Sequence, residues 1–578
     1  MDSSRVLVAV VLSIVLVVAY QELVLKRFFP PPTEQQQQAA EQAKAAKAAQ
    51  GQAPGVGPSA GATGVPAAGG VATGAAGAAV FTGQQSGAMA PWPGVAAAER
   101  TVEVDSDFYV AVFTTHGARL KSFALRRYRQ DAAKESPPYE MVQSQPGGHL
   151  PLGAVITRGG NLFDDGNLNY ETTAPAQIKP RAGADATAAF VAKTADGATI
   201  TKTFTFRASS YVFSMEVAVA GGAAAANQIG VSMSQPLTAH QGYYDIPELQ
   251  ADVGNKVITE NEKNLKKLKP EEAAVAGAIT YAGFGDRYFL AVFLPTGPAV
   301  GTLTMAYAGD EAIARVLFDG AAQVHSEIYM GPKLLEALEA VNPALHKAID
   351  FGWAGILAII FLRALKLFHY VAPNYGVDIV LLTVFIRLAL LPISIKSQRS
   401  MMKMQRLQPQ MTRLREKYKD NNEQLQKEMV DLYKRNHVNP LGGCAPMALQ
   451  LPIFIGLYEA LMNSIELRHA PFVGWINDLS SPDCLHIPGL PQLPLMHCHG
   501  LPVLVLLMGA TTFIQQYMTP TSPDPNQQKM MMLTPLIFTI MFINFPAGLV
   551  LYYFSSNLLG VIQQYFLNLE FQQYTPAT

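Results

Sequence analysis

The residue least suited to its surroundings is Arg387, in the middle of an apolar run of membrane-spanning length from Val377 to Lys396. On a helix that rises 1.5 Å per residue, Arg387 lies about 13 Å from Lys396 and therefore near the middle of a bilayer. An arginine at that depth costs roughly 2.5–3.5 kcal/mol on insertion scales, so such residues normally face water or protein and mark function. Thr383 lies one turn away on the same face. The pair predicts attraction of acidic or polar groups, without any redox or acid–base step.

A second polar face lies on the last apolar stretch, where Tyr553, Ser556 and Asn557 recur at helical spacing. Such residues also serve as contacts between helices, worth about 0.6 kcal/mol each in measured cases, and this reading stays open. No Asp or Glu stands at the depth of Arg387, so we expect a hydrated groove that opens toward Lys396. The candidate groove residues are Thr383, Arg387, Gln450, Tyr553, Ser556 and Asn557.

The sequence carries no motif of an enzyme active site. GxSxG, HExxH and phosphate-binding loops are absent, as is a convincing acid pair, so we predict no catalytic residue, no cofactor and no resident metal. With 578 residues, 49 % of them hydrophobic and 15 % charged, the chain is too long for one domain and more apolar than a typical soluble protein. The net charge of −1 gives no indication of nucleic-acid specificity.

The charges are strongly segregated along the chain. Residues 396–437 carry eleven Lys and Arg against five Asp and Glu, a net charge of +6 with His neutral. By the positive-inside rule this segment is cytoplasmic. It is expected to form two amphipathic helices at 398–416 and 421–437, which make a hairpin. Its candidate docking residues for a ribosome and a nascent chain are Lys403, Arg406, Arg413, Arg415 and Lys417.

The pattern of apolar and polar residues divides the chain into a membrane part and an external part. Alternating strand patterns occur at 101–114, 118–128, 199–208, 211–219, 278–294 and 300–306, which predicts a large β-sandwich. The expected order is a transmembrane signal anchor at 1–27, a disordered Gln/Ala/Gly/Pro-rich linker at 28–98, the β-sandwich domain at 99–333, a linker and amphipathic interfacial helix at 334–372, a five-span helical core at 374–567 and a short cytoplasmic tail at 568–578.

Six membrane spans are expected in all. The N-terminal apolar run lacks a convincing cleavage site, which favours an uncleaved anchor over a signal peptide. The four core spans after the arginine-bearing run are predicted at 445–462, 501–517, 530–545 and 548–567. With 396–437 in the cytoplasm, both termini are cytoplasmic and the β domain lies outside.

Three cysteines are too few for a disulfide framework, but two of them flank an external loop. Cys484 and Cys498 are expected to form a disulfide there, because disulfides persist outside the cytoplasm. The alternatives are a zinc or copper ion bound by His486, His497 and His499, or no role at all.

The C-terminal 230 residues resemble the YidC/Oxa family of membrane protein insertases. The resemblance rests on short motifs in order: NPLGGC at 439–444, LPIF at 451–454, LRHAPF at 467–472, WINDLS at 475–480, PDPNQQKM at 523–530 and FPAGLVLYY at 545–553. The anchor, linker and β domain look like the Gram-negative branch, which implies a bacterial inner membrane protein with a periplasmic β-supersandwich.

The resemblance implies insertion of nascent membrane proteins into the lipid bilayer, alone or with the Sec translocon, and delivery by ribosomes. It gives a groove role to Arg387, Thr383 and Tyr553. The chain departs from the family in lacking a basic tail, so the hairpin at 396–437 would have to dock ribosomes. Asn544 stands where an aromatic residue is familiar, and 482–500 looks like an insertion.

Two other classes of function stay open. An anion or solute transporter could use Arg387 as its binding site, although the five core spans show no internal repeat. An intramembrane enzyme, or a sugar-modifying one working through the β domain, lacks any nucleophile, base or metal signature.

Overall fold

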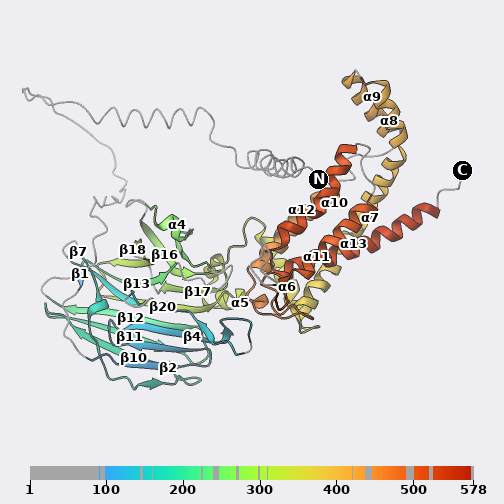
Figure 1. Ribbon diagram of the computed structural model, residues 1–578. Coiled ribbons are helices and arrows are strands. Elements are labelled where there is room, and N and C mark those ends of the chain that lie inside the picture. Colours follow the sequence, from blue (N-terminus) through green and yellow to red (C-terminus); the bar gives the residue numbers. More distant parts are fainter. Residues whose placement is uncertain are drawn as a thin grey trace, which may run out of the picture. The chain divides into compact units, whose positions relative to one another are not determined.

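A computed structural model describes residues 90–91 and 98–573 of the chain, except for 134, 144–147, 159–160, 223–225, 238–245, 269–272, 297–299, 309, 420, 437–444, 490–499 and 520–524 (Figure 1). The predicted anchor at 1–27 and almost all of the predicted linker at 28–98 lie outside the described residues, as does the NPLGGC motif. The described residues form a β domain and a set of helices.

The β domain is built on one large sheet. Its strands are antiparallel except where β1 pairs with β7, and β16 joins its two halves by pairing first with β18 and then with β17 and β14. In order, the fifteen strands are β1 (Ala90–Pro91), β7 (Asn161–Asp164), β6 (Gly153–Arg158), β13 (Gln228–Pro236), β19 (Glu311–Asp319), β18 (Val300–Ala308), β16 (Ala274–Gly285), β17 (Phe289–Pro295), β20 (Gln323–Pro332), β12 (Val212–Gly221), β11 (Ala198–Phe206), β10 (Ala186–Lys193) and β8 (Glu171–Thr172), with β14 (Glu248–Val253) attached to β16 and β15 (Lys256–Glu260) attached to β14.

A second sheet packs against this one through an aromatic core. Phe113 and Phe123 on its inner face meet Phe204 and Phe213 of the large sheet, with Phe113 and Phe204 centroids 4.7 Å apart and Phe123 and Phe213 centroids 6.1 Å apart. These rings are almost completely buried, and their burial helps to hold the two sheets together. The five strands are β5 (Pro138–Glu140), β4 (Arg119–Arg129), β3 (Tyr109–Thr114), β2 (Thr101–Asp105) and β9 (Gln177–Ile178).

The β-sandwich prediction is confirmed, but two predicted strands are each two strands. The run 101–114 turns at residues 106–108, where the Ser106 amide donates to the Tyr109 carbonyl. The run 278–294 turns after Asp286, whose side chain accepts the amides of Tyr288 and Phe289. In both places a short polar side chain takes up amides that a continuous strand would use in pairing.

The C-terminal half is helical. The described helices are α4 (Glu262–Leu265) within the β domain, then α5 (Leu335–Val341), α6 (Gly355–His369), α7 (Tyr375–Arg406), α8 (Gln408–Lys417), α9 (Asn422–Arg435), α10 (Ala445–Met462), α11 (Val503–Met518), α12 (Pro525–Phe542) and α13 (Ala547–Gln573). A small β-ribbon of β21 (Leu485–His486) and β22 (Gly500–Leu501) lies between α10 and α11 in the sequence.

Among the described residues, α7 alone is long and apolar enough to cross a membrane by length and composition. Shorter apolar stretches at Leu449–Met462, Val503–Met518 and Met532–Phe542 lie within α10, α11 and α12. The four helices α10 to α13 fall close to the predicted spans, and α10 has the predicted bounds. The count of six spans remains a prediction.

The predicted start of the cytoplasmic hairpin is wrong. Helix α7 continues without a break to Arg406, and the chain turns only at Leu407 before α8 begins. The sequence from Lys396 to Arg406 contains no Gly or Pro, so nothing ends the helix where it becomes polar. The hairpin proper is α8 and α9, which pack through Leu407 and Met411 against Met429, Leu432 and Tyr433.

Candidate functional site

Arg387 lies where α7 packs against α13, and an uncharged side chain holds it. Its Nε donates a hydrogen bond of 2.9 Å to Oγ of Ser556, which is buried. Within the described residues, no carboxylate makes an ion pair with this guanidinium. The positive charge of Arg387 is therefore not neutralised by a carboxylate among the described residues.

A glycine on α13 makes room for the guanidinium. A Cβ atom at Gly560 would lie 2.6 Å from Nε2 of Gln515 and 3.4 Å from Nη2 of Arg387. A Cβ atom here would collide with Gln515 and would touch Arg387 at an ordinary contact distance, so Gly560 permits α7, α11 and α13 to meet at this point. The amide of Gln515, which was not among the predicted groove residues, thus belongs to the environment of Arg387.

A tyrosine that the sequence did not single out links α13 to α10. Gln450 donates a hydrogen bond of 2.7 Å from Nε2 to the hydroxyl of Tyr552, which is almost completely buried. The predicted groove residue Tyr553 is half-buried and packs instead on the rings of Phe454 and Phe542, 5.2 Å and 5.0 Å away. Tyr552 precedes Ser556 by four residues, so helical spacing could have found it.

The remaining two predicted groove residues are buried in the helix packing. Thr383 has no exposed surface, and its hydroxyl donates to the carbonyl of Ile379 in its own helix. This environment differs from the water-facing one that we expected for Thr383. Asn557 donates from Nδ2 to Oγ1 of Thr512 at 2.7 Å, which ties α13 to α11.

Polar contacts between α7 and α13 continue beyond Arg387, in the direction of Lys396. Gln563 donates from Nε2 to Oγ of Ser394 at 2.9 Å and to Oε1 of Gln398 at 3.2 Å. From Ser556 to Gln563, uncharged polar side chains therefore follow the seam between the two helices. This seam and the contacts to α10 and α11 define the candidate site as a polar cluster centred on Arg387.

The opposite end of α7 is held by caps and a buried pair. Asn374 accepts the amides of Gly376 and Val377 and donates to the carbonyl of Phe472. The Asp378 carboxylate is completely buried, and its Oδ2 lies 2.7 Å from Nδ1 of His369 on α6. These contacts fix the end of α7, so that Arg387 is presented from a rigid element.

The start of α13 is also fixed by main-chain contacts. The amides of Ala547 and Gly548 donate to the carbonyls of Ser481 and Leu479, each at 2.8 Å. Asp478 stabilises that same loop by accepting from the hydroxyls of Ser480 and Ser481. The WINDLS and FPAGLVLYY motifs thus meet, and they set the position of the helix that bears Ser556 and Gly560.

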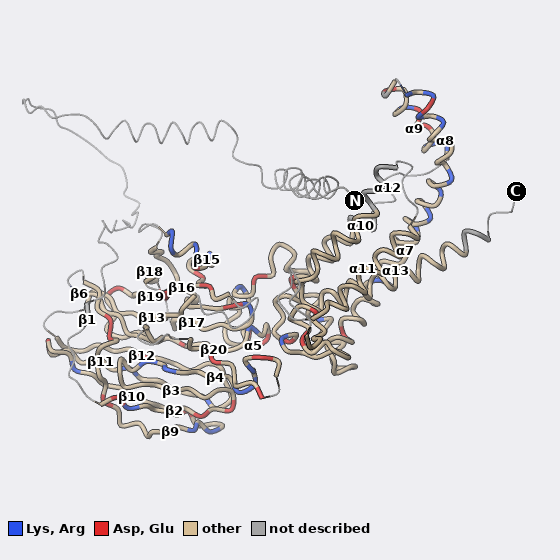
Figure 2. Tube along the Cα trace, viewed as in Figure 1, with Lys and Arg blue, Asp and Glu red and all other residues tan. Residues whose placement is uncertain are grey.

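The predicted docking cations lie on the outer helices of the set. Figure 2 shows Lys and Arg concentrated from the end of α7 through α9, whereas α11 and α13 are largely free of charge where they are described. Lys403 and Arg406 end α7, and Arg413, Arg415 and Lys417 lie on α8. All are exposed except Arg415, which is half-buried beside Tyr433.

Cys484 is disulfide-bonded. It directly precedes β21, whose partner strand β22 begins at Gly500. Cys498 and two of the three histidines of the alternative metal site, His497 and His499, lie outside the described residues, so the pairing of Cys484 with Cys498 stays a prediction. No cluster of metal-binding side chains occurs among the described residues.

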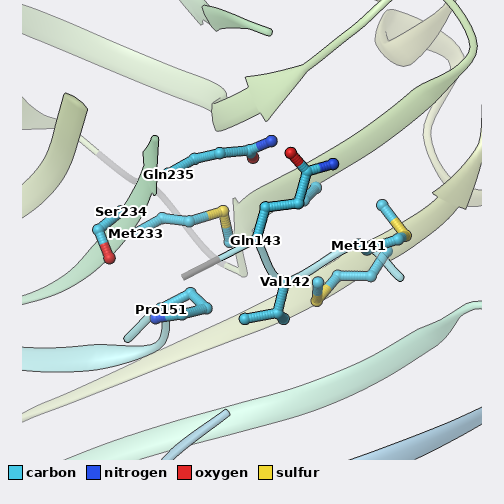
Figure 3. Close-up of a pocket in the computed structure, with 9 residues that line it drawn as sticks. Met141, Val142, Gln143, Pro151, Met233, Ser234 and Gln235 are labelled. Atoms are coloured by element: carbon cyan, nitrogen blue, oxygen red, sulfur yellow. The ribbon is translucent and has the colours of Figure 1, made fainter. Parts of the chain in front are cut away.

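The β domain contains a small pocket lined by Met141, Val142, Met233 and Met330 together with polar residues (Figure 3). The figure shows the Met233 thioether between Ser234 and Gln143, with the Gln235 side chain above it. The cavity measures about 10 Å³, which is room for roughly one water molecule. A sugar would not fit, so this pocket gives no support to a sugar-modifying activity.

Two known protein families match the chain, and together they cover most of it. The family described as 60Kd inner membrane protein matches residues 366–574, and the YidC periplasmic domain matches residues 101–363. These matches define the class: an inner membrane protein whose helical part carries a periplasmic β domain. The matched helical part contains all of α7 to α13 and hence the whole polar cluster.

Relatives from other bacteria narrow the class to a family. The membrane protein insertase YidC of Syntrophus aciditrophicus is 35 % identical over 485 residues, which are 81 % of this chain and 85 % of that protein. The protein of the same name from Geotalea daltonii is 34 % identical over 493 residues, 83 % of this chain and 88 % of that one. The chain belongs to the YidC family of membrane protein insertases. These relatives confirm the family resemblance that the motifs indicated. They also confirm the prediction that the chain is an insertase and not an enzyme.

A solved structure is also similar. The crystal structure of an active YidC insertase with its first transmembrane domain resolved has 18 % sequence identity, covers 85 % of this chain and 96 % of its own, and gives a TM-score of 0.34.

Proposed function

We propose that this chain inserts nascent membrane proteins by offering Arg387 to acidic or polar segments that must cross the bilayer. The observation that carries the proposal is the pairing of Arg387 with the neutral Ser556. A guanidinium without a carboxylate partner is stabilised at this depth by water or by an anion. The groove is proposed to open toward Lys396 and the cytoplasm, because that is where the polar seam leads.

The short apolar helices support a second part of the mechanism. Helix α11 has 16 residues, and α10 and α12 have 18 each, which is at or below the lower end of the roughly 17–25 residues that span an ordinary bilayer. Short spans are matched by local thinning of the bilayer. We propose that this thinning lowers the barrier for the polar segment, while the apolar flank of the client slides along the outer helix faces.

The proposed topology has six spans, with both termini and α8–α9 in the cytoplasm and the β domain in the periplasm. The eleven cations of residues 396–437 support that orientation. The proposed partners are the ribosome, through the exposed cations of α8 and the end of α7, and the Sec translocon for larger clients. Helix α6 is proposed to lie in the membrane interface, since Ile356, Ile360 and Leu367 on the helix are exposed, as is Trp353 just before it.

The test is insertion in proteoliposomes that contain only the purified chain. A single-spanning client with an acidic external segment is synthesised in their presence, and protease protection measures the inserted fraction. We expect several-fold more insertion than into empty liposomes of the same lipids. Equal insertion into both would contradict the proposal, and uptake of phosphate or chloride by the same vesicles would support the transporter instead.

A further inference from the structure

A cavity of about 330 Å³ lies beside Arg387, between α7 and α13. On α7 it is lined by Val384, Leu388, Leu391 and Ile395, which recur at i, i+4, i+7 and i+11 and therefore form one stripe. This stripe differs from the positions of Thr383 and Ser394 on α7. The Thr383 hydroxyl bonds within α7, and the Ser394 hydroxyl accepts from Gln563 of α13. The cavity is thus a neighbour of the polar cluster that shares only Arg387 and Gln563 with it.

The cavity faces the surroundings of the helices rather than their interior. Leu388 on one wall is 61 % exposed, and Phe566 on the other is 63 % exposed. The chain spans a membrane, so exposed apolar side chains on α7 and α13 at this level contact lipid tails. Gln563 lines the cavity but already donates to Ser394 and Gln398, and Arg387 donates to Ser556. Eight of the ten lining residues are apolar, so the surface offered to an occupant is mainly apolar, with Arg387 as its one charged group.

The cavity is large enough for an extended acyl chain but too small for an α-helix. An α-helix with its side chains is about 10–12 Å across, so a stretch as long as the stripe from Val384 to Ile395 would not fit into 330 Å³. That volume is at the lower end of the range for small-molecule sites, about 300–1,000 Å³. A single acyl chain is narrow and apolar enough to fill it.

Basic residues stand at the level where the head group of such a lipid would lie. Arg399 follows Ile395 by four residues on the same face of α7, and Arg406 follows by two further turns. Twelve residues separate Arg387 from Arg399, which is about 18 Å on a helix and slightly more than half of a hydrocarbon core of about 30 Å. The sequence contains no Asp or Glu between Asp378 and Glu416. A lipid held here would therefore gain from a negative head group.

We propose that this cavity binds one acyl chain of an anionic phospholipid from the cytoplasmic leaflet, with the lipid phosphate at Arg399. The site rests on the topology proposed above but requires no client protein. The bound chain covers the outer side of Arg387 and separates the polar cluster from the bilayer along the α7–α13 seam. Water and polar segments then reach Arg387 only from the other side of the seam.

The test uses the purified full-length chain in nanodiscs of phosphatidylethanolamine with a small fraction of photoactivatable lipid. That lipid carries a diazirine in the acyl chain and is either phosphatidylglycerol or phosphatidylethanolamine. After irradiation, mass spectrometry maps the labelled peptides. We expect phosphatidylglycerol to label the lining segments of α7 and α13 about fivefold more than phosphatidylethanolamine does.

Matched variants decide whether the label reports this cavity. Leu391→Trp fills it and is expected to abolish labelling there, whereas Leu507→Trp, at an exposed α11 position outside the lining, leaves it unchanged. Arg399→Gln is expected to remove the preference for phosphatidylglycerol, and Arg413→Gln on α8 to keep it. Equal labelling by the two lipids, or labelling indifferent to Leu391→Trp, would overturn the proposal. Because no client is present, either failure is distinct from a failure of insertion.

Discussion

Replacing Gly560 by alanine should displace Gln515, which meets Arg387 at this glycine, without changing the charge of the arginine. The added Cβ atom would lie 2.6 Å from Nε2 of Gln515, closer than real Cβ contacts come, and 3.4 Å from Nη2 of Arg387. Overpacking of this kind costs about 1–3 kcal/mol. The nearest atom ends a flexible side chain that can move aside, so the lower limit of about 1 kcal/mol applies here.

A cost of about 1 kcal/mol lowers, by about fivefold, the population of molecules in which Gln515 and Arg387 pack at residue 560 as they do in the wild type. We therefore expect Gly560→Ala to reduce insertion of a client with an acidic external segment by up to about fivefold. A client of the same length with a neutral external segment should lose less. Protease protection in proteoliposomes, at equal amounts of folded insertase, measures both.

Gly509→Ala is the matched control. Its Cβ atom would lie 2.3 Å from Oγ1 of Thr539 on α12, a tighter contact with a shorter side chain, and the atoms nearest to it all belong to Thr539 rather than to a residue of the Arg387 cluster. This variant should destabilise the protein more than Gly560→Ala and yet affect the two clients equally. If Gly509→Ala discriminates between the clients and Gly560→Ala does not, the placement of Arg387 is not what matters.

Three further predictions concern charge, the β domain and the external loop. Arg387→Glu should impair acidic clients most and Arg387→Ala less, as measured by protease protection, and equal effects on neutral clients would contradict a role for charge. Lys202→Met should destabilise the β domain by up to about 3 kcal/mol at pH 7, by pulse proteolysis in urea, because it breaks a completely buried ion pair with Asp165, which keeps Arg119 as its other partner. Burial lowers the pKa of Lys202 to about 8, below that of the unfolded chain at about 10.4, so wild-type stability should rise relative to Lys202→Met between these values. Thiol counting by mass spectrometry should find two more thiols after reduction, and an unchanged count would exclude a Cys484–Cys498 disulfide.

The helices could be predicted from the sequence because apolar length alone marks them. The bounds of α10 are as predicted, and α11 and α13 begin within two residues of their predicted starts. The prediction failed at Lys396, because polarity marks the edge of a bilayer and not the end of a helix. Helix α7 runs ten residues further, to Arg406.

The partners of Arg387 could be predicted only in part. Spacing along one helix identified the face of α13 that carries Ser556, and the structure places Ser556 on the guanidinium. Spacing within a single helix does not say how neighbouring helices are rotated. Because of that rotation, Tyr552 rather than Tyr553 accepts the hydrogen bond of Gln450. For the same reason, the Thr383 hydroxyl bonds to the Ile379 carbonyl of its own helix.

The central claim is that translocating segments pass the polar cluster at Arg387. A photocrosslinking amino acid at Gln450 or Gln515, both half-buried beside the cluster, tests it directly during synthesis of a membrane protein. The same probe at Leu507, an exposed apolar position on α11, serves as control. The account predicts that Gln450 and Gln515 capture the polar external segment of the nascent chain well above Leu507. Capture no better than from Leu507 would contradict it.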